Sequence, residues 1–263
     1  MTSELRVMLH GEVPELDAAR VLAGLSKMLD LLGELEDEFA GDRKAKAHTT
    51  WRFNRLALGS VDTAFAPNRV REGLDSTAIT EMLHTAVEGF DRAEHDQPLP
   101  STWMSSAARS GAEIAEGLDA GFGASMTLDV ITNGHAVRTV EVTRQAAVGF
   151  RKALNPQYIS VGSVTGTLES INLHEKRQAG LWTDRTGRRV PVAFDERHED
   201  AVRDLLGKRV EVWGELRRNV FGDLLSVRLQ RYEVLPSSGD DLPLTALIGL
   251  APGGSGEFGE AGR

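Results

Sequence analysis

The sequence contains no cysteine, and this absence excludes disulfide bonds, thiolate zinc sites, iron–sulfur clusters and cysteine nucleophiles together. It also lacks any apolar run approaching the roughly 20 residues that span a bilayer. The amino end, Met1-Thr2-Ser3-Glu4, has neither the basic region nor the apolar stretch of a signal peptide. These absences predict a cytoplasmic protein without a membrane partner.

Motifs typical of catalysis or metal binding are also missing. The seven histidines form no HxH or HExxH pattern and no pair at the spacing of a metal loop. Neither a Gly-x-Ser-x-Gly elbow nor a P-loop occurs. Residues 254–259 match the letters GxGxxG, but that motif binds dinucleotides only where it joins a strand to a helix, and here it lies in a Gly-rich end. We therefore predict no catalytic residue, no metal site and no cofactor.

The composition is that of a folded protein with room for two domains, at 263 residues with 41% apolar and 26% charged side chains. Its richness in Ala, Gly, Arg and Asp, with few Lys, is typical of a high-GC bacterium or its phage. A net charge of −9 disfavours a general nucleic-acid binder, because phosphate repels an acidic surface. Residues 157–236, however, hold 13 Lys and Arg against 12 Asp and Glu, so the acidity lies in the rest of the chain.

Residues 1–156 have the pattern of an antiparallel α+β domain in which helices pack on β-hairpins. Leu and other apolar residues recur at helical spacing, whereas the strands alternate apolar and polar residues. Helices are expected at 15–39, 76–94, 102–118 and 143–154, and strands at 5–9, 49–53, 61–65, 126–130 and 137–142. Asn133-Gly134 is a strong signal for a two-residue hairpin turn. Because the hairpins outnumber any parallel crossover, the sheet is expected to be antiparallel.

Between 158 and 235 the pattern changes to strand, strand, strand, short helix, strand, strand. Val164, Gly166 and Leu168 alternate, and then the phase slips, as in a bulged and strongly curved strand. Gly187 provides the positive φ of a short hairpin turn. Helical spacing follows over 199–206, and two more alternating strands complete the order.

This order resembles that of OB-fold modules, and an SH3-like or other small β-barrel is the alternative. The resemblance implies a five-stranded barrel with one short helix over 157–236. It also implies a surface that binds single-stranded nucleic acid or a protein, and seldom one that performs chemistry.

Aromatic and arginine side chains near strand ends and loops of this barrel form a candidate nucleic-acid surface. Trp213 alternates with inward residues, so it is expected to point outward beside Arg217. In the alternative interpretation, Trp213 and Tyr232 pack against the amino-terminal domain and the arginines pair with neighbouring carboxylates. The candidate set is Trp182, Arg185, Arg188, Arg189, Trp213, Arg217, Arg218 and Phe221.

Residues 237–263 begin as a linker and then become unexpectedly apolar. The apolar residues have the spacing of a short amphipathic segment, which docks either on its own domain or in the groove of a partner. The arrangement resembles that of small bacterial antitoxins and adaptor proteins, whose flexible end occupies a toxin or an enzyme. The candidate partner-binding residues are Leu242, Leu244, Leu247, Ile248 and Leu250.

Two main function hypotheses follow. The favoured one is a non-catalytic interaction protein, antitoxin-like or an adaptor, that binds a protein partner through the α+β domain and the tail. The alternative is a protein that binds single-stranded nucleic acid on the barrel. An enzyme without a readable motif is the third and least favoured class.

Overall fold

The computed structural model describes residues 3–11, 16–40, 48–57, 61–119, 123–174 and 177–236. The fold is α+β, with one open sheet and one sheet closed into a barrel. The chain divides into two compact units, Met1–Ile159 with Arg217–Leu225, and Ser160–Leu216 with Ser226–Arg263. The five apolar candidates of the tail lie outside the described residues. Within the described ranges, every helix is too short or too polar to cross a membrane.

The open sheet belongs to the first unit and is antiparallel, as the hairpin pattern predicts. Its strand order is β2-β3-β1-β4-β5. On the central strand, Leu5, Val7 and Leu9 alternate with more exposed residues and face the core. The strands are β1 (Ser3–His10), β2 (Thr50–Ala57), β3 (Asp62–Arg69), β4 (Ser125–Thr132) and β5 (His135–Val142).

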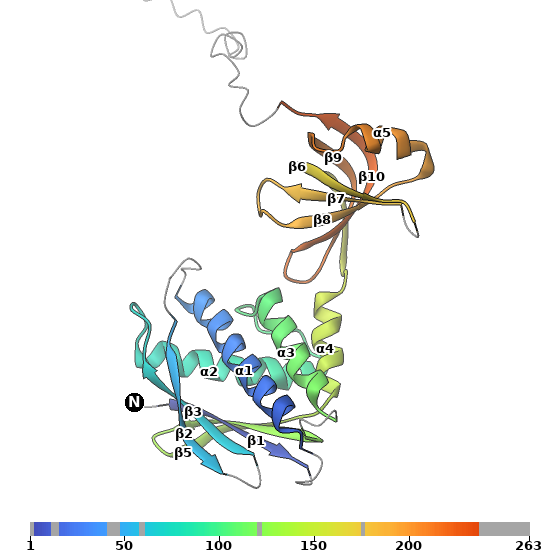
Figure 1. Ribbon diagram of the computed structural model, residues 1–263. Coiled ribbons are helices and arrows are strands. Elements are labelled where there is room, and N and C mark those ends of the chain that lie inside the picture. Colours follow the sequence, from blue (N-terminus) through green and yellow to red (C-terminus); the bar gives the residue numbers. More distant parts are fainter. Residues whose placement is uncertain are drawn as a thin grey trace, which may run out of the picture. The chain divides into compact units, whose positions relative to one another are not determined.

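Four helices cover one face of this sheet (Figure 1). They are α1 (Ala18–Phe39), α2 (Ser76–Glu94), α3 (Ser105–Gly117) and α4 (Gln145–Leu154). Aspartates cap the first two, because Asp17 and Asp75 accept hydrogen bonds from the backbone N–H three residues later. The sequence predicts that α3 starts at Thr102, but it starts at Ser105. The backbone N–H of Trp103 donates to the carbonyl of Pro100, so this segment is a separate turn.

An aromatic cluster of Phe90, Trp103 and Phe150 fills the space between the helices. Trp103 stacks on Phe150 with ring centroids 5.2 Å apart, and Phe90 meets both rings edge-on. Glycines allow this close packing: a Cβ at Gly89 would overlap the Trp103 indole, and one at Gly149 would overlap the carbonyl of Ala93. The crossing of α4 over α2 therefore depends on a missing side chain.

The second sheet is a closed barrel with the order β10-β8-β7-β6-β9. Strands β8 and β10 are parallel, whereas β7 pairs antiparallel with both of its neighbours. The third and fifth strands of the barrel, β8 and β10, are therefore parallel, and a helix lies between the third and fourth strands. This is the OB-type arrangement, so the predicted five-stranded OB-like barrel is confirmed. The elements are β6 (Tyr158–Asn172), β7 (Gln178–Thr183), β8 (Arg189–Ala193), α5 (Glu199–Asp204), β9 (Arg209–Arg218) and β10 (Leu224–Val234).

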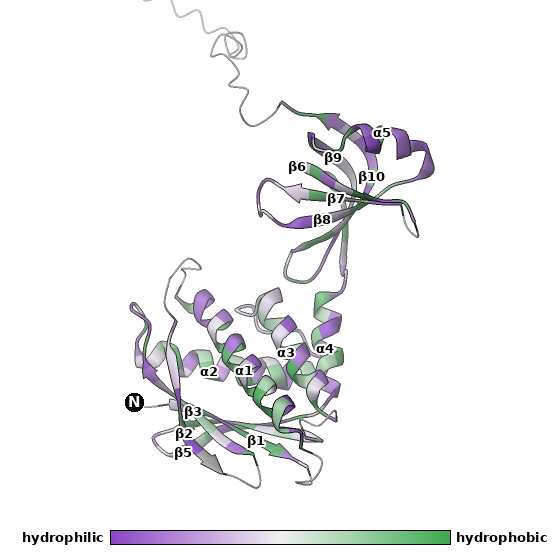
Figure 2. Ribbon diagram, viewed as in Figure 1, coloured by the Kyte–Doolittle hydropathy of each residue, from purple (hydrophilic) through white to green (hydrophobic). Residues whose placement is uncertain are grey.

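Local sequence features explain the curvature and closure of the barrel. The expected phase slip in β6 is a register shift between Leu168 and Ser170. A Cβ at Gly214 would overlap the carbonyl of Arg228, so only glycine lets these strands approach. Figure 2 shows α5 as largely hydrophilic, and its buried Val202 faces the interior.

Candidate functional site

OB barrels bind oligonucleotides on the face of their second and third strands and on two adjacent loops. In this chain those strands are β7 and β8. Along β7, Ala179, Leu181 and Thr183 are buried, so Trp182 points outward, and its side chain is 42% exposed. Trp182 lies directly opposite Arg189 in the antiparallel register. An indole and a guanidinium are therefore cross-strand neighbours on the outer surface.

Gly180, two residues before Trp182 on β7, leaves room for the side chains of Arg189 and Ser170. The Arg189 guanidinium lies against the space that a Cβ of Gly180 would occupy. Its Nη2 atom also donates to the hydroxyl of Ser170 on β6, at 3.3 Å. Contacts with Gly180 and Ser170 thus hold the guanidinium over the neighbouring strands, two residues along β7 from Trp182.

The turn between β7 and β8 presents two more exposed arginines, Arg185 and Arg188. Gly187 takes a φ of +61°, as the sequence predicts, and its N–H donates to the carbonyl of Thr183. The Thr183 hydroxyl donates to the carbonyl of Arg188, which ties the turn to the barrel. In the described part of the chain, neither Arg185 nor Arg189 forms an ion pair with a carboxylate.

Trp213, on β9, is half-exposed and has a different partner from the one that the sequence predicts. The Arg231 Cζ atom, on β10, lies 5.3 Å from the centroid of the Trp213 ring. Arg217 is four residues along the same strand, about 13 Å away at the usual rise of a strand. An adjacent strand brings a side chain closer, which is why Arg231 covers one face of the indole.

The loop between β9 and β10 carries the remaining candidates. Phe221 packs against the hydrophobic core of the first unit, and residues 217–225 belong to that unit. Arg218 donates from Nη1 to the carbonyl of Gly222, at 3.0 Å. The Asn219 side-chain oxygen accepts from the backbone of Phe221 and Asp223, which fixes the shape of the loop. Phe221 and Arg218 therefore do not join Trp182 on the β7–β8 face.

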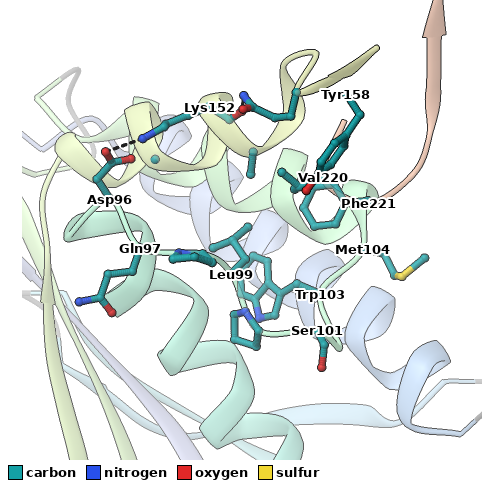
Figure 3. Close-up of a pocket in the computed structure, with 15 residues that line it drawn as sticks. Asp96, Gln97, Leu99, Ser101, Trp103, Met104, Lys152, Tyr158, Val220 and Phe221 are labelled. Carbon is teal, nitrogen blue, oxygen red and sulfur yellow. Dashed lines mark hydrogen bonds and ion pairs between the residues drawn. The ribbon is translucent and has the colours of Figure 1, made fainter. Parts of the chain in front are cut away.

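A pocket of ≈560 Å³ lies within the first unit, a size that is typical of small-molecule and peptide sites. Figure 3 shows Tyr158, Val220 and Phe221 on one side and Leu99 and Trp103 on the other. An ion pair at the rim joins Lys152 Nζ and Asp96 Oδ2 at 2.6 Å. This pocket has no signal in the local sequence, because its walls come from segments far apart along the chain.

A charged cluster on the opposite face of the open sheet is structural. Arg6 of β1 makes a bidentate ion pair with Asp62 of β3, at 2.7 and 2.8 Å, and lies 3.6 Å from Asp129 of β4. The hydrogen bonds from Arg6 lower the pKa of Asp62. These contacts join three neighbouring strands. Across the described ranges, no three metal-ligating side chains converge on one point.

Comparisons with known proteins assign no family. No family model matches the sequence, and no curated protein matches it. Among solved structures, RecG bound to a three-way DNA junction aligns with a TM-score of 0.22 and 15% identity. That alignment covers 38% of this chain and 16% of the RecG chain. A similarity of this size carries no argument about function.

Proposed function

We propose that this chain is a cytoplasmic, non-catalytic protein that binds single-stranded nucleic acid on the β7–β8 face of its barrel. The observation that carries the proposal is the exposed Trp182 indole directly opposite Arg189. A base stacked on an aromatic side chain contributes about 1–3 kcal/mol, whatever its identity. The neighbouring guanidinium supplies a phosphate contact or a second stacking plane.

The distribution of charge along the chain supports the choice of this face for a nucleic-acid strand. The barrel is close to neutral, whereas the rest of the chain carries the acidity that repels phosphate. Arg185, Arg188 and Arg189 lie at one end of the β7–β8 hairpin, beside the indole. If these arginines contact phosphates, the log of the affinity should fall with the log of the salt concentration with a slope of about −2.

Replacing Trp182 with alanine is expected to weaken the binding of a labelled single-stranded oligonucleotide about tenfold or more, because the stacking surface is lost. Fluorescence anisotropy at low salt measures the affinity. Trp213→Ala is the matched control, since Trp213 is already covered on one face by Arg231, and it should change the affinity little. Absence of binding to the intact protein at low salt, or equal losses for the two variants, would contradict the proposal.

Protein binding by the α+β unit, in an antitoxin-like or adaptor role, is a second candidate function. The observation that favours it is the largely apolar pocket beside Leu99 and Phe221, which suits an apolar side chain of a partner. The apolar tail would extend the contact. Both functions are compatible with a single complex, since they use different surfaces.

Met104→Lys is expected to weaken capture of a co-purifying protein about tenfold, because it places a charge at the wall of this pocket. Pull-down from a lysate of the source cell, with the partner identified by mass spectrometry, is the measurement. Leu22→Lys is the matched control, because Leu22 is 66% exposed on α1 and does not line the pocket. The role of the tail is tested separately by deleting residues 240–263. Unchanged capture by Met104→Lys and by the deletion would exclude this function.

A further inference from the structure

The first half of β6 has an unpaired edge. In the barrel order, β6 lies between β7 and β9. Its ladder with β7 starts only at Gly166, opposite Thr183, and runs to Asn172. In the part of the chain that the structure describes, no strand pairs with residues 160–164 on the β7 side. The N–H and C=O groups on this side are therefore open to a further strand.

This edge lacks the features by which proteins protect exposed strands. Charged side chains and prolines normally prevent an edge from pairing with another strand. Residues 158–168 contain neither a charged residue nor a proline. Instead, Ile159 and Val161, which alternate on one side of the strand, are 65% and 78% exposed. An uncharged edge with exposed β-branched side chains favours the addition of a strand.

The last described residue, Pro236, lies near this edge. Its carbonyl accepts from Arg209 Nη1, at 3.4 Å. Arg209 Nε donates to Asp184 Oδ2, at 2.9 Å, and the Asp184 N–H donates to the carbonyl of Thr165, at 3.1 Å. All four residues lie in the second unit. Three successive contacts thus link Pro236 to the residue at which the unpaired edge begins.

The sequence beyond Pro236 contains a segment that suits this edge. From position 242 to position 250 the even-numbered residues are all apolar, which is the alternation of a strand with one apolar face. Like the β6 edge, residues 244–250 carry no charge. Residues 237–243 precede them and can span about 25 Å, which is enough to turn the chain back along β6. Pro243 comes just before the segment, where its missing N–H costs no ladder hydrogen bond.

We propose that residues 244–250 bind along residues 160–164 of β6 as an added antiparallel strand of the same chain. The tail starts near the Thr165 end of the edge and β6 runs toward that end, so the two segments run in opposite directions. The backbone of the tail pairs with the open N–H and C=O groups of β6, and its apolar side chains cover Val161. A partner that takes the tail, as in the second function proposed above, first has to displace it from β6.

Because the chain has no cysteine, pairs of introduced cysteines test this contact in the full-length protein. Val161→Cys is combined in turn with Leu244→Cys, Ala246→Cys and Ile248→Cys, and disulfide formation in oxidised glutathione is followed by mass spectrometry of the digested chain. The matched control is Leu206→Cys with the same tail cysteines, because Leu206 is 52% exposed in the same unit but lies outside β6. A disulfide requires Cα atoms within about 7 Å, so at least one Val161 pair should form within the chain ten or more times faster than its control.

Hydrogen exchange of the unmodified chain supplies an independent readout. Amides of residues 244–250 should exchange slowly, because an added strand donates hydrogen bonds to β6. Deleting residues 240–263 should speed exchange in residues 160–164 at least tenfold. The amides of β7, which pair within the barrel, are the control and should exchange at the same rate in both chains.

Three results would overturn the proposal: equal disulfide rates at Val161 and Leu206, disulfides only between two chains, or exchange in residues 160–164 that the deletion leaves unchanged. Disulfides only between chains would mean that the edge pairs with a second copy of the protein. Circular dichroism checks that each variant is folded. No oligonucleotide or partner enters these experiments, so their outcome is independent of both functions proposed above.

Discussion

Replacing Gly149 with alanine is expected to destabilise the first unit by about 3 kcal/mol. The new Cβ would overlap the carbonyl of Ala93, and both groups are held by helical backbone that cannot rotate away. Helix α4 would have to move off α2, which separates Phe150 from Phe90. Glu94 also ties the start of α4 to α2 by accepting from the backbone N–H of Ala146, at 3.1 Å.

Urea denaturation followed by circular dichroism measures the loss. Gly33→Ala is the matched control, since it also replaces a helix-interior glycine but meets no atom closer than 4.0 Å. That control should be neutral or stabilising by up to about 1 kcal/mol, because alanine is the better helix former. Similar effects of the two substitutions would show that the α2–α4 contact is not closely packed.

Glu36→Ala is the second substitution with a large expected effect, a loss of about 3 kcal/mol in the free energy of unfolding. The Glu36 carboxylate is 0% exposed, and it accepts from the Thr49 N–H at 3.0 Å and from the Thr49 hydroxyl at 2.9 Å. Removing it leaves both donors buried without an acceptor. It also frees the start of β2 from α1.

The same denaturation experiment tests this prediction. Thr49→Val removes the hydroxyl but keeps the backbone N–H, so it should cost roughly half as much. Glu81→Ala, at an exposed site, should stay within about 0.5 kcal/mol of the wild-type protein. If Glu36→Ala is as stable as Glu81→Ala, the buried carboxylate gives no net stabilisation.

Local signals predicted most of the elements correctly. The helix expected at 76–94 is α2 with the same bounds, because an aspartate cap begins it and a proline segment follows it. The Asn133-Gly134 turn has φ values of 51° and 83°, as a type I′ turn requires. Where a single residue sets the backbone, the neighbouring residues are enough to predict the outcome.

Errors arose where packing, and not the local pattern, decides. Val137 is expected to join Val140 and Val142, but it lies three residues before Val140, so it points to the other face and is 53% exposed. It also lies at a register shift, because Arg138 pairs with Val130 and Ala136 with Ile131. The turn at Pro100 delays the start of α3 and lets Trp103 donate from Nε1 to the carbonyl of Thr85. That contact depends on a residue far away in the chain.

Alternation of apolar residues, glycines at the turns and bends, and the position of one short helix were enough to determine the OB-type barrel from the sequence. The candidate sites depended on tertiary structure. Strand register places Arg189 opposite Trp182, an adjacent strand supplies Arg231 to Trp213, and segments far apart in the chain line the pocket beside Leu99. Element type follows from interactions between residues close in the chain, whereas a site requires residues that only folding brings together.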